Sequence, residues 1–333
     1  MKAYVVEKYK KGEPLVEHVL PAPAPGPSDV VVRIEAAGLN LLDIKIRNGE
    51  FKPILAYKPP FILGHDLAGT VTSVGSQVRR FKVGDAVYAR PRDGRIGAFA
   101  EAIAIHEDDV ALKPANLSVT EAAGVPLVAL TAWQALVEVG QVKPGQKVFI
   151  QAGSGGVGTI AIQLAKHLGA TVATTCGASS IDLVKGLGAD VAIDYRTQDI
   201  EKELSGYDLV LHSQDDATLQ KSLRVLKPGG HLISISGPPT PTFAKAQGLN
   251  FVLRLVLGLI SRKARKAAAR LGVNYSFLFM RADGGQLAEI AKLIEEGTIK
   301  PVLDRTFPFR DLNKALSLVE SGRAKGKVVV ELG

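Results

Sequence analysis

The chain has 333 residues, of which 46% are hydrophobic and 22% charged, a balance that is typical of globular proteins and excludes a disordered chain. At this length we expect two domains, each able to bury its own core. The net charge of +8 can concentrate anionic ligands, but the sequence lacks zinc-finger spacing, an aromatic ribonucleoprotein motif and a long basic tract, so we expect no specific nucleic-acid binding. The single cysteine, Cys176, excludes an intramolecular disulfide, and the first residues lack the apolar core of a secretory signal, so we expect a cytoplasmic protein.

Residues 1–122 are rich in short strand-like runs that Pro and Gly interrupt. Examples lie at residues 30–35, 69–75 and 83–88. Strands of this length between turn residues predict a β-barrel-like first domain.

Residues 147–169, KVFIQAGSGGVGTIAIQLAKHLG, predict a strand, a glycine turn and a helix in succession. Gly153, Gly155 and Gly158 form a G-x-G-x-x-G pattern, with Gly156 as a fourth glycine. In this context one glycine permits the tight turn, one lets the backbone approach a pyrophosphate, and one lets the helix pack close to the strand. The helix N-terminus adds free N–H groups and a positive dipole end. The pattern therefore predicts a dinucleotide site, and a tight turn without a ligand is the alternative.

The next strand pattern, at residues 171–176, indicates which dinucleotide is bound. An NAD site usually carries Asp or Glu about 20 residues past the glycine motif, where it binds the ribose 2′-hydroxyl. This strand carries no carboxylate, so nothing there repels a 2′-phosphate. Ser179 and Ser180 can bind that phosphate, and Tyr195 and Arg196 can complete the pocket. We therefore expect NADPH as the cofactor, and the alternative is that the two serines cap the following helix.

Strand and helix patterns alternate from residue 123 to about residue 295. Further strands are expected at residues 191–194, 209–212, 231–236 and 273–280. This alternation predicts a doubly wound parallel sheet. A helix is expected at residues 286–296, and the tail then returns to strand character and is expected to complete the first domain. We therefore place the domains at residues 1–122 with 297–333, and at residues 123–296.

Residues 249–260 form an apolar run that contains Arg254 and is too short to span a bilayer. A basic cluster follows at residues 262–270. One interpretation is an interfacial helix that meets anionic lipid, with weak membrane contact through residues 249–270. The other, which we favour, is a dimer-interface or cleft-covering helix with a solvated basic end, since apolar patches also mark protein contacts. We accordingly expect a homodimer.

Seven ordered motifs resemble the medium-chain dehydrogenase/reductase superfamily, and more closely its zinc-independent quinone oxidoreductase and enone (alkenal) reductase branch. The motifs are GLNLLD at residues 38–43, LGHDLAG at 63–69, VGDAV at 83–87, LTAWQAL at 130–136, the glycine turn, LKPGG at 226–230 and GKVVV at 326–330. Together they cover essentially the whole chain. The resemblance implies a GroES-like β-barrel domain beside an NADP-binding Rossmann domain, and a small-molecule quinone or enone as substrate.

The chain departs from the zinc alcohol dehydrogenases of that superfamily. Those enzymes carry a cysteine ligand where Asn40 stands and a glutamate where Asp66 stands, and their lobe of closely spaced cysteines is absent here. A catalytic zinc needs three protein ligands, and His65 and Asp66 supply only two adjacent candidates. We therefore expect no metal, and we interpret His65 as a core or cleft histidine.

Without a metal, a substrate carbonyl needs another electrophile. Asn40 can donate an N–H to a substrate oxygen, and the cation of Lys45, two residues past Asp43, can polarise a carbonyl or an enolate. The resemblance puts Asp43 and Lys45 at the cleft, and a surface ion pair between them is the alternative. Tyr57 is a weaker candidate for the proton donor, and its simpler interpretation is an apolar rim residue.

The resemblance also implies a set of cofactor contacts. They are Thr131 at the nicotinamide riboside, Gly155, Gly156 and Val157 at the pyrophosphate, Ser236 and Gly237 at a strand end on the nicotinamide side, the backbone from Phe277 to Phe279 at the carboxamide, and Lys327 approaching from the other domain. Each of these residues has a packing role as its alternative, most of all Phe277 and Phe279.

These features predict an NADPH-dependent reductase that transfers hydride to quinones or α,β-unsaturated carbonyl compounds. Two alternatives stay open. One is a zinc-free alcohol/aldehyde oxidoreductase, and the other is a non-catalytic protein on the same fold that senses nucleotides or associates with RNA or membranes.

Overall fold

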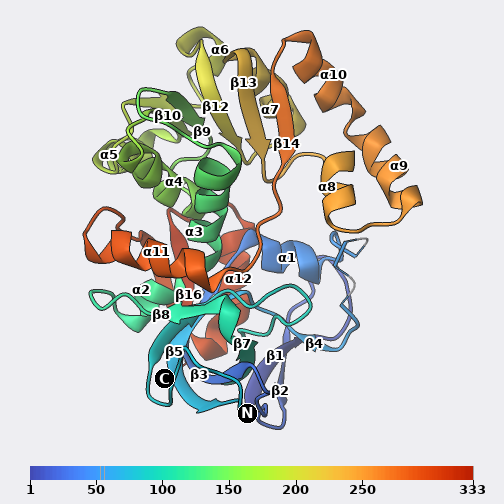
Figure 1. Ribbon diagram of the computed structural model, residues 1–333, viewed down its shortest axis with the longest axis vertical. Coiled ribbons are helices and arrows are strands. Elements are labelled where there is room, and N and C mark those ends of the chain that lie inside the picture. Colours follow the sequence, from blue (N-terminus) through green and yellow to red (C-terminus); the bar gives the residue numbers. More distant parts are fainter. Residues whose placement is uncertain (53, 56, 333) are drawn as a thin grey trace. The chain divides into compact units, whose positions relative to one another are not determined.

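The computed structural model describes residues 1–52, 54–55 and 57–332. The chain divides into two compact units, whose elements are labelled in Figure 1. The first unit comprises Met1–Leu130 and Arg281–Gly333, and the second comprises Thr131–Met280.

The first unit is built around a β-sheet. Its strands are β1 (Lys2–Val6), β2 (Val16–Val19), β3 (Asp29–Leu39), β4 (Phe61–Ile62), β5 (Asp66–Val74), β6 (Ala86–Ala89), β7 (Ala102–His106), β8 (Val110–Leu112), β15 (Leu303–Pro308) and β16 (Lys327–Glu331). The main sheet runs in the order β15-β16-β3-β5-β6-β8, with β7 paired to β3, while β1 lies between β2 and β4 in a second sheet. In the long strand β3, Val30 and Val32 are fully buried, as β-branched residues on an enclosed pleated strand often are.

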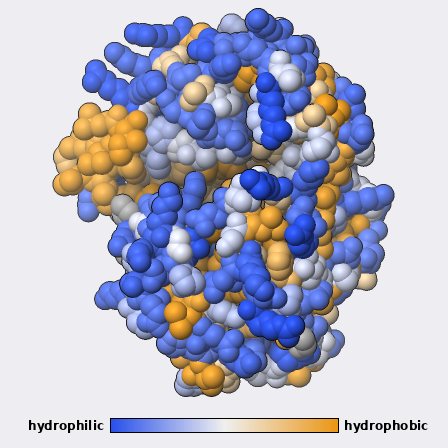
Figure 2. Space-filling model, turned by 180° about the vertical axis from the view of Figure 1, so that it is seen from behind, coloured by the Kyte–Doolittle hydropathy of each residue, from blue (hydrophilic) through white to orange (hydrophobic). Residues whose placement is uncertain are grey.

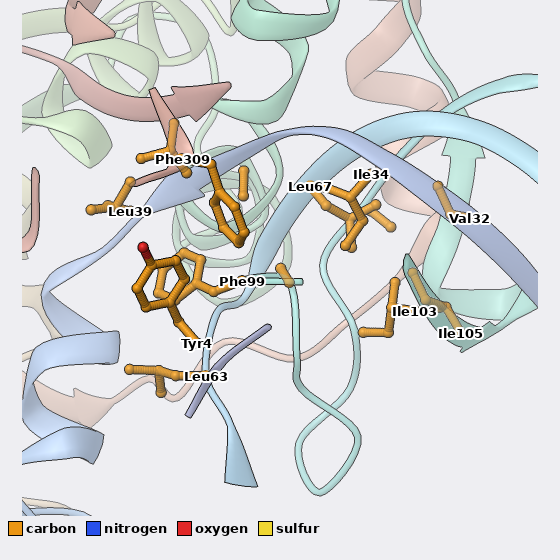
Figure 3. Close-up of a cluster of buried hydrophobic side chains, with 14 of the residues drawn as sticks. Tyr4, Val32, Ile34, Leu39, Leu63, Leu67, Phe99, Ile103, Ile105 and Phe309 are labelled. Carbon is orange, nitrogen blue, oxygen red and sulfur yellow. The ribbon is translucent and has the colours of Figure 1, made fainter. Parts of the chain in front are cut away.

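Short helices close the first unit. They are α1 (Leu41–Arg47), α2 (Val119–Ala123), α11 (Gly284–Glu295), α12 (Leu312–Glu320) and the start of α3 (Pro126–Trp133), with single 3-10 turns η1 (Glu107–Asp109) and η4 (Phe309–Asp311). The core brings the two ends of the chain together, and Figure 3 shows Phe309 beside Tyr4. These two rings meet edge to face with their centroids 5.0 Å apart. On the main sheet, β16 pairs antiparallel with β3, with Val329 opposite Gly38. The last strand of the chain therefore belongs to the first unit.

The boundaries between the units differ from the expected ones at both ends. Helix α11 packs with the first unit, because the Tyr88 hydroxyl donates to the Leu287 carbonyl O at 2.6 Å. A Cβ at Gly284 would also lie 2.3 Å from the Val110 carbonyl O, so the start of α11 lies directly against β8. Residues 123–130 stay with the first unit as well. The boundary between the first and second units therefore falls after residue 130 rather than 122, and the boundary where the chain returns to the first unit falls after residue 280 rather than 296.

The second unit is a doubly wound parallel sheet, as its alternating pattern predicted. Its strands are β9 (Lys147–Ile150), β10 (Thr171–Cys176), β11 (Val191–Asp194), β12 (Tyr207–His212), β13 (Leu226–Ser234) and β14 (Asn274–Phe277). They run in the order β11-β10-β9-β12-β13-β14, so the chain reverses its direction of sheet growth between β9 and β12. In open α/β sheets, ligands bind outside the carboxyl ends of the strands at such a reversal.

Helices connect these strands. They are η2 (Gln134–Val139, a π-helical turn), α4 (Gly156–His167), η3 (Ala178–Ser180), α5 (Ile181–Gly186), α6 (Ile200–Glu203), α7 (Asp216–Arg224), α8 (Pro241–Ala246), α9 (Phe251–Ile260) and α10 (Arg262–Arg270). Gly169 follows α4 with φ of +80°, the left-handed conformation that ends a helix.

Several expected elements shift. The strand expected at residues 83–88 begins only at Ala86, because Gly84 adopts a φ of +93° in a turn where Asp85 N–H bonds to the Lys82 carbonyl O. The strand expected at 231–236 ends at Ser234, so Ser236 and Gly237 lie beyond it. Helix α12 replaces part of a tail for which only strand character was expected.

Candidate functional site

The glycine turn joins β9 to α4 and leaves space at one glycine. Gly155 is the N-cap residue of α4, and a Cβ there would meet only the Ala152 carbonyl O, at 3.3 Å. A Cβ at Gly153 would lie 2.1 Å from Thr174 Oγ1, and one at Gly158 would lie 2.3 Å from the Ala152 carbonyl O. Packing of the turn therefore requires Gly153 and Gly158. The absence of a side chain at Gly155 instead leaves backbone that a ligand can approach.

Two threonines of β10 hold this turn in place. Thr174 Oγ1 donates to the Ile150 carbonyl O at 2.6 Å, and Thr175 Oγ1 accepts from the Ala152 N–H at 3.1 Å. Ala152 itself has a φ of +52°, a conformation that costs energy for a residue with a Cβ. Sequence reasoning missed both threonines. The available signal was two adjacent hydroxyls in the buried part of the strand, where the other residues are apolar.

The N-terminus of α4 fits an anionic group. The helix has 12 residues and begins with Gly156, Val157 and Gly158, whose N–H groups lie in the first turn and so lack intrahelical partners. Gly155 has no side chain that could cap them, and no side-chain cap bond is present. The helix dipole adds positive potential at the same place. Turn and helix together therefore fit the pyrophosphate of a dinucleotide.

The residues expected around a 2′-phosphate come together at the same edge of the sheet. Cys176 and Asp194 are opposite each other at the ends of β10 and β11, so Ser179 and Tyr195 follow neighbouring strand ends. Tyr195 is 57% exposed, and the Arg196 guanidinium lies 5.6 Å from its ring centroid. A hydrogen bond to the Tyr195 side chain raises the pKa of Arg196, which stays cationic.

The two serines of this loop differ in their surroundings. Ser179 is exposed, whereas Ser180 is buried. Ser180 stands at the N-cap position of α5, but its side chain makes no cap hydrogen bond, so the capping alternative does not describe it. At Gly177 a Cβ would meet nothing within 4 Å. The surface beside the loop is therefore open.

Ser236 and Gly237 lie just past β13 in a network around His212. Ser234 Oγ accepts from the Gly237 N–H at 2.7 Å and is 2.8 Å from His212 Nδ1, while Ser236 Oγ donates to the Gln214 carbonyl O at 2.7 Å. Burial lowers the pKa of His212 to about 4, so its ring is neutral at neutral pH. The Ser236 hydroxyl is thus committed to the protein, and the loop backbone is what remains for a ligand.

The rings of Phe277 and Phe279 pack against a helix of the second unit. Both meet Phe243 of α8 edge-on, with centroids 5.0 and 6.2 Å apart. The side chains therefore follow the packing alternative, which leaves their expected backbone role untouched. Thr131, the first residue of the second unit, is buried in α3.

A buried polar cluster occupies the first unit around Asn40 and Lys327. The ammonium group of Lys327 donates to the Leu39 carbonyl O at 2.9 Å and to Asn40 Oδ1 at 2.5 Å, and pairs with Asp66 Oδ2 at 3.0 Å. Asn40 Nδ2 donates to the same Asp66 oxygen at 3.0 Å. The other Asp66 oxygen accepts from the Leu127 N–H at 2.7 Å. All three ammonium protons of Lys327 are thus used inside the first unit, where the side chain positions Asn40 and Asp66, and its expected cofactor contact stays a prediction.

Asp43 and His65 form a second buried pair beside this cluster. Asp43 Oδ1 is 2.5 Å from His65 Nδ1, and Asp43 Oδ2 accepts from the Asn40 N–H at 2.8 Å. Both side chains are fully buried. His65 Nε2 has no hydrogen-bond partner among the described residues. The sequence interpretation of His65 as a core or cleft histidine agrees with this burial, but it missed that Asp43 orients the ring.

The structure argues against the simpler alternative for Lys45 and in favour of the simpler alternative for Tyr57. Lys45 is half-buried and makes no ion pair with Asp43 or any other described residue, so the surface-pair alternative does not hold. Tyr57 stacks on Phe61 with centroids 5.1 Å apart and accepts from the Gly94 N–H at 3.2 Å. Burial raises the pKa of Tyr57 to about 12, which favours the simpler interpretation of a rim residue.

The donor set around Asn40 does not fit a catalytic zinc. His65 offers an open donor atom in Nε2, but both Asp66 oxygens are committed to protein donors, one of them the Lys327 cation that would repel a metal ion. An amide oxygen also stands where a thiolate would be required. Across the described ranges, no three His, Cys, Asp or Glu side chains gather as a metal site.

The chain matches known families over most of its length. Residues 26–115 match the alcohol dehydrogenase GroES-like domain, and residues 187–330 match the zinc-binding dehydrogenase family.

Individual relatives cover nearly the whole chain. The chain is 34% identical to the zebrafish (Danio rerio) mitochondrial NAD(P)H oxidoreductase RTN4IP1, covering 100% of this chain and 91% of the relative. It is 35% identical to the chloroplastic NADPH-dependent alkenal/one oxidoreductase of Arabidopsis thaliana, covering 99% and 79%. The crystal structure of the Escherichia coli quinone oxidoreductase complexed with NADPH superimposes with a TM-score of 0.82 at 26% identity, covering 100% of both chains.

Proposed function

Because this chain belongs to the medium-chain dehydrogenase/reductase superfamily and is an oxidoreductase with a nicotinamide cofactor, we propose that it is an NADPH-dependent reductase of quinones or α,β-unsaturated carbonyl compounds that works without zinc. The observation that carries the proposal is the open backbone at Gly155, at the point where sheet growth reverses. A bound nicotinamide supplies the hydride. The protein itself binds, orients and polarises.

The second unit supplies the groups that would hold the cofactor. The N-terminus of α4 faces the pyrophosphate through Gly156 and Val157, with Gly155 leaving room for it. Open space at Gly177 and the Arg196 cation support a 2′-phosphate, and hence NADPH over NADH. Thr131 and the backbone from Phe277 to Phe279 are proposed for the nicotinamide end.

The first unit supplies the proposed electrophile. Lys45 is the candidate, because no described carboxylate neutralises its charge and a cation is what a developing enolate or quinol oxygen needs. Asn40 is held by Lys327 and Asp66 with one amide N–H left over, so it can still donate to a substrate oxygen. Asp43 acts indirectly by orienting His65 and fixing the Asn40 backbone.

Replacing Lys45 with Met tests its role separately from cofactor binding. The variant is expected to lower kcat/KM for the acceptor by about 100-fold, the typical loss of one oxyanion-stabilising group, with the Kd for NADPH unchanged. Lys11→Met, which removes an exposed lysine of the same unit, is the matched control and should leave both values unchanged. A Lys45→Met enzyme with wild-type kcat/KM would remove this residue from the proposal.

A panel of acceptors offered with NADPH and NADH tests the proposed reaction. NADPH oxidation that depends on a quinone or an enone is the expected result, followed by the absorbance of the reduced nicotinamide. Turnover of alcohols or aldehydes alone would favour the zinc-free alcohol/aldehyde oxidoreductase instead. Tight NADPH binding with no turnover on any acceptor would favour the non-catalytic, nucleotide-sensing alternative.

We also propose that the protein is cytoplasmic and forms a homodimer. The single, buried Cys176 suits a reducing compartment. Among the described strands, β14 pairs only with β13, which leaves one backbone edge available to a second copy. Sedimentation at several protein concentrations measures the assembly, and a strictly monomeric species would contradict the dimer.

A further inference from the structure

Helix α9 presents apolar side chains to solvent. Its outward positions are 43% exposed at Val256 and up to 71% exposed at Phe251, and none of its residues is buried. The exposed set consists of Phe251, Val252, Leu255, Val256, Leu259 and Ile260, which we call the α9 face. These positions repeat every four residues and so lie on one side of the helix. Figure 2 shows apolar side chains gathered in a protruding patch at the left of that view.

The opposite side of α9 attaches the helix to its own unit. A Cβ at Gly258 would touch Pro241 of α8 at 3.4 Å, so the two helices approach closely there. Arg254, the charge within α9, is half-buried and turns its Nε onto the Leu249 carbonyl O at 2.7 Å. The helix therefore packs through its less apolar side and leaves its most apolar side uncovered, the reverse of an ordinary surface helix.

Helix α10 follows after Ser261 and is strongly basic. It is anchored through Ala264 and Ala268, which lie in the core of the second unit. Arg262, Lys266 and Arg270 are exposed and form no hydrogen bond or ion pair with the part of the chain that the structure describes. An apolar face and a set of uncompensated cations thus follow each other within 20 residues.

The joint between the two helices is held by Arg265. Its Nη2 donates to the Gly258 carbonyl O at 2.9 Å and its Nε donates to Ser261 Oγ at 3.2 Å. Ser261 Oγ in turn donates to the Leu257 carbonyl O at 2.7 Å. These bonds fix the α9 face relative to the cations of α10.

The excess of positive charge in the chain lies in the segment of residues 217–282, which contains α9 and α10. Residues 217–282 contain 11 Lys and Arg and no Asp or Glu. Of the 41 Lys and Arg this leaves 30 elsewhere, against 33 Asp and Glu, so the net charge of +8 comes entirely from this segment. Five of the eleven cations pair with carboxylates outside the segment, namely Lys221, Arg224, Lys227, Lys263 and Arg281. The charge that remains for an anionic partner is therefore that of the unpaired cations of α10.

We propose that the α9 face and the cations of α10 dock the protein on an anionic lipid surface. Apolar side chains on a helix that lies in the interface, beside Arg and Lys that meet anionic headgroups, are the features of peripheral membrane helices. A second copy of the chain fits less well, because a two-fold contact places each patch against itself and would bring cations together without any carboxylate to pair them. Among the described residues, no helix combines the length and apolarity needed to cross a membrane.

Flotation with lipid vesicles tests the proposal without reference to enzyme activity. Wild-type protein should float with phosphatidylcholine vesicles that contain phosphatidylserine at least about 10-fold more than with pure phosphatidylcholine, and higher salt should reduce the bound fraction. Leu255→Gln combined with Leu259→Gln should lower binding at least 10-fold. Arg262→Gln combined with Lys266→Gln and Arg270→Gln should reduce it to the level on neutral vesicles.

Controls separate docking from loss of fold and from self-association. Val19→Gln and Lys82→Gln remove an exposed apolar and an exposed basic side chain of the first unit and should leave flotation unchanged. The α9 and α10 variants should keep the wild-type melting temperature, because the altered side chains are exposed. Wild-type protein that stays off anionic vesicles, or α9 variants that float like wild type, would overturn the proposal. So would a Leu255→Gln/Leu259→Gln protein that turns from dimer to monomer without lipid, because the α9 face would then be an interface between copies.

Discussion

Replacing Gly155 or Gly158 with valine separates ligand approach from packing within one turn. At Gly155 the φ of −84° suits any L-residue, and a new Cβ would meet only the Ala152 carbonyl O, at 3.3 Å. At Gly158 the Cβ would lie 2.3 Å from the same carbonyl O and 2.6 Å from the Gly153 Cα. Backbone atoms cannot swing aside as the end of a flexible side chain can, so the second substitution must displace the helix from the turn.

The expected magnitudes follow from these distances. Overpacking against backbone costs about 3 kcal/mol or more, so Gly158→Val should lower the melting temperature by roughly 6–12 °C, as scaled for a domain of 150–250 residues. Gly155→Val should cost less than about 1 kcal/mol. Its side chain would nevertheless stand where the pyrophosphate meets the backbone, and NADPH affinity should fall at least about 100-fold, which is about 2.7 kcal/mol.

Fluorescence titration with NADPH and a thermal melt measure the two effects on the same samples. Gly155→Val should lose binding with its melting temperature nearly unchanged, and Gly158→Val should lose both. Tight NADPH binding by Gly155→Val would refute the reasoning, because the glycine turn would then not be the phosphate site.

Three further predictions concern cofactor choice, pH and metal. Gly177→Asp should fit without loss of stability, because a Cβ there meets nothing within 4 Å, and should reverse the cofactor preference from NADPH to NADH. The uncharged Gly177→Asn variant is the control and should keep the preference for NADPH. Equal or tighter NADH binding by the wild type would contradict this prediction. The pKa of His212 lies at about 4, below its unfolded value of 6.5, so between these pH values the unfolded chain binds more protons than the folded one. As the pH falls through that window, His212 should therefore lower the free energy of unfolding by up to about 3 kcal/mol. Urea unfolding at several pH values should show a shallower loss for His212→Asn, and an equal loss in both proteins would exclude this origin. Elemental analysis should find no stoichiometric zinc and chelation should leave activity intact, whereas one zinc per chain with activity lost to a chelator would overturn the metal-free proposal.

The elements that the sequence predicted well are those with local causes. Strand β10 begins and ends at its expected residues, and α4 follows the glycine turn as expected, because hydrophobic periodicity and glycine spacing act over a few residues. The tail was harder. Helix α12 lies between two strand patterns, so only strand character was expected for the tail. The apolar residues of this helix find their packing partners, β15 and β16, only in the folded unit.

The parts of the site that sequence could not give depend on contacts between distant residues. Lys327 and Asn40 are 287 residues apart, and nothing local marks a lysine as buried, since lysines are mostly exposed. Likewise, the Tyr88 bond to α11 moves a domain boundary without any sequence signal of its own. The sequence indicated a core or cleft histidine at position 65, but the pairing of His65 with Asp43 appears only when α1 and the start of β5 come together in the fold.

Oxidation of stereospecifically deuterated NADPH tests the central claim most directly. The two C4-deuterated epimers are oxidised separately with a quinone and with an enone, and the mass of the NADP⁺ that forms is measured. A reductase that holds the cofactor in one orientation should remove deuterium from one epimer and keep it in the other with whichever acceptor turns over. No oxidation with either acceptor, or equal loss of label from both epimers, would contradict the account.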